Sequence, residues 1–127
     1  MAPELSPALR EFLGERHLAA LVTVRADDTP HSVPVGFTYL DGVARVITSS
    51  GSVKVSNVRG HGWAAVTQID GRRWVTLEGP ARVLDDAEAV ELAVGLYEQR
   101  YRPPRENAQR VVIEIEVQRV MTNSGLR

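Results

Sequence analysis

The chain of 127 residues contains no cysteine, a single lysine and few aromatic residues. The lack of cysteine excludes disulfide bonds, thiol nucleophiles and cysteine-ligated metal sites, and it is typical of a cytoplasmic protein. No apolar run approaches the roughly 20 residues that a membrane-spanning helix needs. The first residues also lack the charged-then-apolar pattern of a signal peptide. We therefore expect a soluble, cytoplasmic protein that does not enter a membrane.

A strong charge of either sign is also lacking, because the formal net charge is −1 at pH 7. Nucleic-acid-binding domains are normally much more basic, so we expect no nucleic-acid partner. The hydrophobic content of 43% and the charged content of 24% are ordinary for a globular protein. A chain of this length is predicted to form one domain over residues 1–127, with its own core.

The hydrophobic periodicity predicts a mainly β protein with α elements. A first helix is expected from Ser6 onward, with Leu9, Phe12 and Leu13 on its apolar face. Further helices are expected in a short stretch around Lys54 and over 85–100. Pro80 predicts that its strand is an edge strand or contains a bulge. About six antiparallel strands predict a small barrel filled by its own side chains, so a sizeable ligand must bind outside. These strands are expected over 19–25, 31–39, 43–48, 63–70, 72–83 and 110–120.

Lys54, the only lysine among 15 basic residues, follows a hydroxyl-rich segment where a strand meets a short helix. Backbone N–H groups and the helix dipole favour an anion at such a point, and an ammonium group adds a compact positive charge. One hypothesis is a phosphate site made by Lys54 with Thr48, Ser49, Ser50 and Ser52. The alternative is a solvated surface lysine. The segment lacks the spacing of a nucleotide phosphate-binding loop, so nucleotide hydrolysis is not expected.

The strand predicted over 31–39 carries small residues on one face, namely Ser32, Pro34 and Gly36. Proline lacks a hydrogen-bond donor for the sheet, and glycine permits the close approach of a ligand or another backbone. A flat ring fits along this strand with its phosphate over the lysine, and His31 borders that position. The alternative is an edge strand softened by proline and glycine.

Four arginines, Arg100, Arg102, Arg105 and Arg110, surround a Pro-Pro turn. They either bind carboxylates of a substrate or of an acidic cofactor tail, or form a solvated loop at a helix C-terminus. Trp74 either stacks on a flat ring or fills a subunit interface. The three histidines show no metal-ligand spacing, so no metal site is expected.

Three segments, in this order and spacing, resemble the split β-barrel flavin and deazaflavin oxidoreductases, the relatives of pyridoxamine 5′-phosphate oxidase. They are residues 29–37, 54–59 and 73–79. Residues 12–19 and 99–114 make the resemblance greatest to the small enzymes that use coenzyme F420, in particular the biliverdin reductase subgroup. The resemblance extends over nearly the whole chain.

This resemblance implies a homodimeric, split antiparallel β-barrel with a deazaflavin site at each side of the subunit interface. It implies that Lys54 and the hydroxyls over 48–52 bind the cofactor phosphate. It also implies that Trp74 approaches the ring from the second subunit. The ring itself is expected beside His31, Pro34, Val35 and Gly36.

The reaction implied by the resemblance is hydride transfer from reduced coenzyme F420 to a conjugated acceptor, with biliverdin favoured. Its propionates are expected to meet Arg100, Arg102 and Arg105. Two alternatives are an oxidoreductase of the same fold that binds FMN, and a non-catalytic protein that binds F420 or a tetrapyrrole. The last residues lack the substrate motif of members that oxidise pyridoxamine phosphate, so that activity is not expected. No side chain stands out as a proton donor, and no catalytic acid is assigned.

Overall fold

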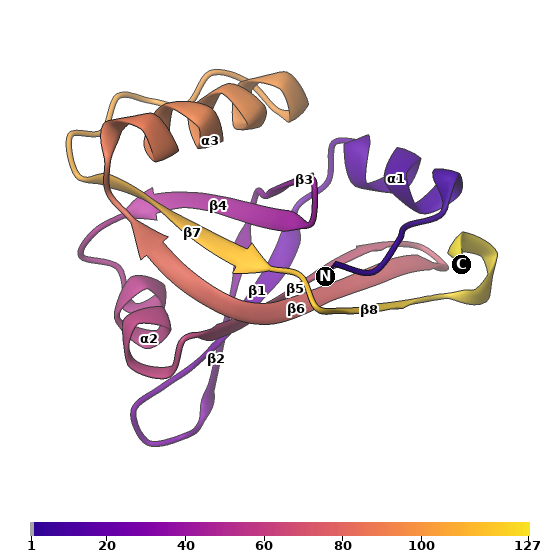
Figure 1. Cartoon of the computed structure of the whole chain (residues 1–127), viewed down its shortest axis with the longest axis horizontal. Helices are drawn as coiled ribbons and strands as arrows, with labels where there is room; N and C mark the ends of the chain where they lie inside the picture. The colour runs from indigo at the N-terminus through magenta and orange to yellow at the C-terminus, as the bar shows by residue number, and fades with distance from the viewer. Residues whose placement is uncertain (1) are drawn as a thin grey trace.

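A computed structural model describes residues 2–127, in which eight strands and three α-helices alternate with short connections (Figure 1). The helices are α1 (Pro7–Gly14), α2 (Val53–His61) and α3 (Ala87–Arg100), and a 3₁₀ turn covers Ser124–Leu126. The strands are β1 (Ala19–Val24), β2 (Pro30–Val35), β3 (Thr38–Leu40), β4 (Val43–Ser49), β5 (Trp63–Asp70), β6 (Arg73–Leu84), β7 (Arg110–Glu116) and β8 (Arg119–Thr122).

The strands form one antiparallel path in the order β2-β1-β5-β6-β7-β4-β3, with β8 paired to β6. Strand β6 joins the two halves of this path, since it pairs with β5 as far as Pro80 and with β7 from Ala81 onward. Within residues 2–127, β3 does not pair back with β2, so the sheet is not closed into a barrel. The predicted antiparallel β architecture is confirmed. The predicted edge position of Pro80 is wrong, because β6 is an inner strand.

The strand predicted over 31–39 is in fact two strands that lie in different halves of the sheet. β2 pairs with β1, whereas β3 pairs with β4. The chain changes its strand partner from β1 to β4 at Gly36 and Phe37. The side chain of Phe37 is fully buried in the core at this point. Alternation along the predicted strand puts Thr38 on the same face as Ser32, Pro34 and Gly36, away from the core. Thr38 is nevertheless buried, because it belongs to β3, which lies against α3.

The strand predicted over 110–120 is also divided, into β7 and β8. Between them, the backbone N–H of Gln118 donates to the carbonyl oxygen of Glu78 over 3.0 Å, which brings the chain onto β6. Gly79 lies directly beneath this connection. A Cβ atom at position 79 would collide with the backbone carbonyl of Glu116, so the crossing requires glycine.

The space enclosed by the strands is filled with apolar side chains. Leu21, Leu77 and Ile113 are fully buried there, and α1 packs its predicted apolar face against them. These side chains occupy the interior, which agrees with the expectation that a sizeable ligand must bind outside. None of the helices described over residues 2–127 is both long enough and apolar enough to cross a membrane.

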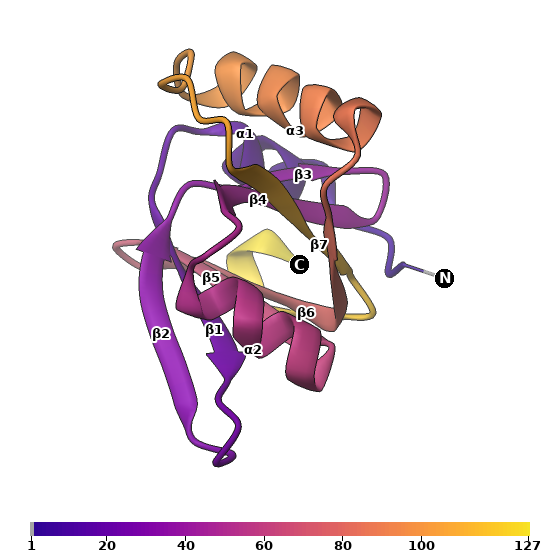
Figure 2. The same ribbon diagram turned by 90° about the vertical axis from the view of Figure 1, so that its left-hand side faces the viewer.

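The helices lie around the open sheet rather than on one face of it. α3 crosses β4 and β7, whereas α2 lies against β1 and β6 (Figures 1 and 2). α3 begins two residues after the start of the predicted range 85–100, because Asp86 is the N-cap residue and accepts a hydrogen bond from Ala89 N over 3.1 Å. The first turn of α2 and the loop that follows α3 both approach the end of β4, and this is where a groove forms.

Candidate functional site

A groove of about 320 Å³ lies where the ends of β2 and β4 meet α2, α3 and the loop after α3. It brings together six of the predicted cofactor-binding residues, namely Pro34, Val35, Gly36, Thr48, Ser49 and Lys54. The groove is also lined by Ile47, Tyr97, Pro104, Asn107 and Arg110. The fold thus joins the predicted ring-binding strand and the predicted phosphate segment in one place.

Lys54 lies in the first turn of α2 with its side chain partly buried. Burial lowers the pKa of its ammonium group, because the charged form loses contact with water. No carboxylate of residues 2–127 pairs with Lys54 within 4.0 Å. A partly dehydrated ammonium group without an acidic partner favours the binding of an anion.

The start of α2 adds to this preference. Ser52 is the N-cap residue, but its side chain makes no capping hydrogen bond to any described residue. Its hydroxyl oxygen instead accepts a hydrogen bond from Thr48 Oγ1 over 3.3 Å. The first N–H groups of α2 therefore lack a side-chain acceptor, and together with the helix dipole they attract negative charge to the position that Lys54 faces.

The loop after α3 holds the hydroxyl-rich segment in place. Asn107 Nδ2 donates to Ser49 Oγ over 2.8 Å, and Ser50 N donates to the carbonyl oxygen of Gln109 over 2.8 Å. Sequence reasoning missed Asn107, because an isolated asparagine in a polar loop carries no motif. Ser50 and Ser52 lie next to the groove rather than on its lining.

Arg110 is a second cation in the groove, and it belongs to the arginine cluster that was predicted to bind carboxylates. Its guanidinium donates to the carbonyl oxygen of Arg105 over 2.5 Å, which fixes its position at the start of β7. Like Lys54, it forms no ion pair within 4.0 Å in the described part of the chain. The groove therefore contains two positive charges that no protein carboxylate compensates.

Another part of the groove lining comes from the end of β2. At Gly36, a Cβ atom would lie 3.0 Å from the ring of Tyr97 and 3.2 Å from the ring of Tyr101. Glycine thus lets two aromatic rings lie close to the backbone at position 36. From the sequence, we expected a ligand or another backbone to make this close approach. In the sequence, Tyr97 has the helical spacing of an apolar face, and no local pattern indicates its place in the groove.

Besides Ser50 and Ser52, two further predicted cofactor-binding residues do not line the groove. His31 is paired with Thr23 in the sheet and points to the same side as Val33, with its Nδ1 atom buried and unpartnered among residues 2–127. Trp74 lies on β6, three strands from β2, and its side chain is 36% exposed beside Ile69. Within one copy of the chain, neither side chain lines the groove.

Arg100 does not have the free guanidinium that a substrate-binding role requires. Its Nε donates to the carbonyl oxygen of Glu15 over 2.9 Å, and its terminal nitrogens donate to Phe37 O and Gln68 Oε1. The guanidinium also lies 4.7 Å from the ring centroid of Phe37. Burial lowers its pKa. The side chain joins α3 to the point where β2 gives way to β3, so the structure supports a positioning role for it.

Glu15, His17 and Asp70 place three potential metal ligands within 4.8 Å of one another, although their sequence spacing shows no metal motif. Arg73 already supplies a cation there, because it donates to both oxygens of Glu15 over 2.8 Å and also to Asp70. The hydrogen bonds from Arg73 and then His17 lower the pKa of Glu15 to about 2. We interpret this cluster as an ion-pair network that ties the end of α1 to the β5–β6 hairpin.

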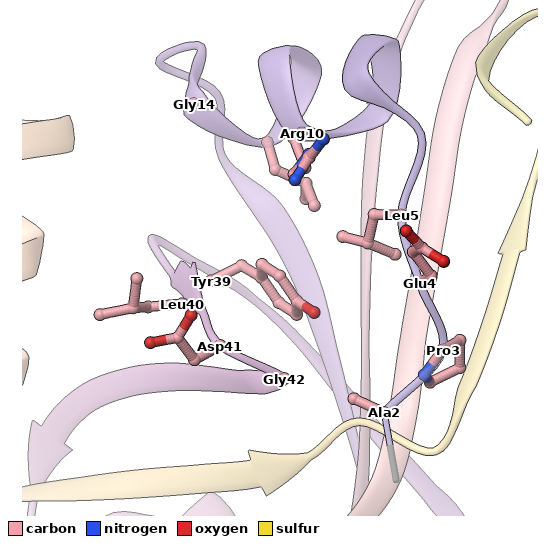
Figure 3. A pocket seen from close by; sticks show the side chains of 11 residues that line it. Ala2, Pro3, Glu4, Leu5, Arg10, Gly14, Tyr39, Leu40, Asp41 and Gly42 are labelled. Carbon is pink, nitrogen blue, oxygen red and sulfur yellow. The ribbon is translucent and has the colours of Figure 1, made fainter.

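A larger hollow of about 440 Å³ lies on another part of the molecule, between the N-terminal segment and the β3–β4 turn (Figure 3). Tyr39 and Asp41 line one side of it, and Leu5 and Arg10 line the other. It shares no residue with the groove around Lys54 and contains none of the predicted cofactor-binding residues. Its size alone therefore does not make it the functional site.

The groove is suited to a ligand with two parts. Lys54, Arg110 and the start of α2 favour an anionic group at one end. The β2 end and Tyr97 offer apolar and aromatic lining for a ring. A phosphate-bearing coenzyme with a planar ring system has both features.

Comparisons with known proteins point in the same direction. The sequence model of a family described as pyridoxamine 5′-phosphate oxidase matches residues 5–124. A protein of Mycobacterium tuberculosis (strain CDC 1551 / Oshkosh) named F420H(2)-dependent biliverdin reductase is 50% identical to the chain over 124 residues. The match covers 96% of this chain and 90% of that protein.

Two solved structures are similar to the chain in fold. A conserved hypothetical protein of Mycobacterium tuberculosis, Rv2991, has a TM-score of 0.81 at 23% identity, with 92% of this chain and 83% of that chain covered. A protein described as an F420 reductase has a TM-score of 0.74 at 22% identity, with coverage of 88% and 94%. At these identities the likeness shows a common fold.

Proposed function

The chain belongs to the pyridoxamine 5′-phosphate oxidase family, and from that premise we propose that it is an F420-dependent oxidoreductase. The acceptor is biliverdin or a related conjugated tetrapyrrole. The observation that carries this proposal is the 50% identity, over 96% of the chain, to an F420H(2)-dependent biliverdin reductase. The groove around Lys54 supports it independently, because its chemistry suits an anionic, ring-bearing coenzyme.

The residues of the groove fit coenzyme F420. The partly buried, unpaired Lys54 and the uncapped start of α2 suit its phosphate. The Ser49 hydroxyl adds a hydrogen-bond donor, because it accepts from Asn107 and its own proton is not used among the described residues. The end of β2 at Pro34 and Gly36 suits the deazaflavin ring. When bound in reduced form, this coenzyme supplies a hydride for the acceptor, and the chain supplies binding and orientation.

The remaining predicted residues enter the proposal with different roles. Arg102 is exposed and free to meet a carboxylate of the acceptor, whereas Arg105 projects from the loop beside the groove and suits the acidic tail of the coenzyme. Trp74 reaches a ring only from a second copy of the chain. A cytoplasmic location, which the lack of cysteine favours, stays a prediction.

The second copy is expected on the outer face of β1, β5 and β6, which is largely apolar. Leu18 is 68% exposed and Ile69 is 64% exposed there, and Trp74 and Met121 extend the same surface. A hollow of about 330 Å³ on this face is lined by Leu18, Ile69 and Pro34, and Pro34 also lines the groove. Large exposed apolar patches mark interaction sites, so a twin subunit here buries the patch and closes the groove.

An Ile69→Lys substitution tests this interface. A lysine that becomes buried without a partner costs several kcal/mol, so the dimer dissociation constant should rise by about a hundredfold or more. Sedimentation equilibrium measures the change. Leu92→Lys is the matched control, because Leu92 is 45% exposed on α3, away from this face, and that variant should stay dimeric. A wild-type monomer, or an Ile69→Lys dimer as tight as the wild type, contradicts the assignment.

The activity itself is tested with purified protein, reduced F420 and biliverdin. We expect the visible absorbance band of biliverdin to disappear at a rate proportional to protein concentration, and F420 to bind more tightly than FMN in a fluorescence titration. Tighter binding of FMN favours the flavin-dependent alternative. Tight binding of F420 without turnover of any tetrapyrrole indicates a non-catalytic binding protein.

A further inference from the structure

A second hollow adjoins the coenzyme groove at Tyr97, which lines both of them. It has a volume of about 380 Å³ and lies between the chain that enters β1 and the end of α3. Its lining consists of Arg16, His17, Leu18, Tyr97, Tyr101 and Arg102. Because Tyr97 and Tyr101 both lie against Gly36, a molecule in the second hollow lies close to the end of β2.

The two arginines of this hollow have no acidic partner. Arg16 and Arg102 are exposed, and neither forms an ion pair within 4.0 Å or a side-chain hydrogen bond with another residue of the range 2–127. Glu15 is adjacent in sequence, but its carboxylate is already bound by Arg73 over 2.8 Å and by His17 over 2.9 Å. The hollow therefore presents two positive charges that are available to a ligand.

The floor of the hollow is a fixed aromatic surface. The rings of Tyr97 and Tyr101 lie with their centroids 4.8 Å apart and their planes at 33°. Tyr101 is held from both sides, since its hydroxyl donates to His17 O over 2.6 Å and accepts from Phe37 N over 3.2 Å. Burial raises the pKa of this hydroxyl, so the phenol remains neutral. Rigid aromatic rings suit contact with an extended conjugated molecule.

We propose that Arg16 and Arg102 bind the two carboxylate arms of the acceptor, while its conjugated body lies against Tyr97 and Tyr101 and extends toward the coenzyme groove. The proposal rests on the proposed function and names the recognition site for its substrate class, a planar tetrapyrrole that carries two carboxylates. The propionates of biliverdin are two such arms. Arg16 is the new element, because it comes from the segment before β1 rather than from the arginine-rich loop.

The arginines are expected to act in binding rather than in the chemical step, because carboxylate arms lie away from the conjugated carbons that accept a hydride. The Arg16→Gln and Arg102→Gln variants should each raise KM for biliverdin by about tenfold, which corresponds to one charge-assisted hydrogen bond, with kcat little changed. The dissociation constant for F420 should stay at the wild-type value. Biliverdin dimethyl ester, which lacks the charges, should show the same KM with the wild type and both variants.

Arg10→Gln is the matched control, since Arg10 is an exposed arginine of α1 that lines neither the hollow at Tyr101 nor the groove at Lys54. Arg10 instead lines the separate hollow at the β3–β4 turn. This substitution should leave KM for biliverdin unchanged. The proposal is overturned if Arg16→Gln and Arg102→Gln leave KM for biliverdin unchanged, or if they raise KM for the dimethyl ester equally, because the effect then does not depend on carboxylates.

An equilibrium titration separates this proposal from the proposed function. Biliverdin binding to the protein, followed by the shift of its visible absorbance band, should weaken about tenfold in each variant without any reductant present. If the wild type fails to reduce biliverdin with reduced F420, the proposed function fails, and the titration still decides the role of the two arginines. Wild-type and variant proteins that bind biliverdin equally well overturn the arginine assignment.

Discussion

Replacing Lys54 by methionine should weaken the binding of coenzyme F420 by about tenfold to 150-fold. Methionine keeps the apolar stem that packs at the start of α2 and removes the ammonium group. A hydrogen bond to a charged group contributes about 1.5–3 kcal/mol, and each 1.4 kcal/mol is a factor of ten in affinity. Because burial already lowers the pKa of Lys54 in the absence of an anion, a bound phosphate should raise that pKa again. Fluorescence titration of F420 measures the affinity of both proteins.

The deazaflavin chromophore without its phosphate and acidic tail provides the control ligand. It should bind the wild type and Lys54→Met with equal affinity, because it has no anionic group for the lysine. An equal loss of affinity for both ligands would show that the substitution disturbs the groove as a whole. An unchanged affinity for F420 removes Lys54 from the coenzyme site.

Gly79→Ala should lower the free energy of unfolding by about 3 kcal/mol or more, at the upper end of the cost of overpacking. The reason is steric, since the added methyl group collides with the backbone carbonyl of Glu116, and backbone cannot move aside as a flexible side chain does. The collision lies where β6 changes its partner from β5 to β7. Relief of the strain must therefore move β6, the strand that joins the two halves of the sheet. Urea denaturation followed by far-UV circular dichroism measures the loss.

Gly95→Ala is the matched control for this substitution. Gly95 lies inside α3, and an added Cβ meets nothing within 4 Å. Alanine is favoured over glycine within a helix by about 0.5–1 kcal/mol, so this variant should be slightly more stable than the wild type. Two variants of equal stability would contradict the steric explanation at Gly79.

The local elements of this fold were largely accessible from the sequence, because each depends on a short pattern. Ser6 and Pro7 mark the start of α1, and its three apolar residues are buried as expected. Asp70 and Gly71 mark the hairpin between β5 and β6. The partner changes at Gly36 and after Glu116 were not accessible. These changes depend on which distant strand each segment pairs with. The sequence pattern that predicts a strand continues across both points, so nothing in it marks the end of one strand and the start of the next.

The residues of the candidate site also fall into those that a local pattern predicts and those that long-range packing brings in. The hypothesis of an anion site at Lys54 came from a lone lysine at a helix start, and the structure places this lysine in a groove with Gly36. The binding of an anion there stays a prediction. Asn107 and Tyr97 complete that groove through long-range packing that no local pattern records. Arg100 was grouped with its neighbours by charge, but three internal acceptors take up its guanidinium. Composition cannot distinguish such an arginine from a free one.

The arginines differ in their proposed roles because their hydrogen-bond partners and positions differ. Arg100 holds the end of α3 against Phe37 and so keeps Gly36, at the end of β2, in position. Arg110 adds charge to the coenzyme groove, and Arg16 and Arg102 remain available in the adjoining hollow. Positioning, coenzyme binding and acceptor recognition are thus assigned to different members of one residue type.

The central claim is that the groove at Lys54 presents a reduced deazaflavin coenzyme directly to a conjugated acceptor. Mass spectrometry of the product tests this most directly, with F420 that carries deuterium at the hydride-donating carbon, and biliverdin as acceptor in ordinary water. We expect one non-exchangeable deuterium in each product molecule, formed only in the presence of the protein. A product without deuterium, formed at the same rate, would contradict direct hydride transfer in this groove.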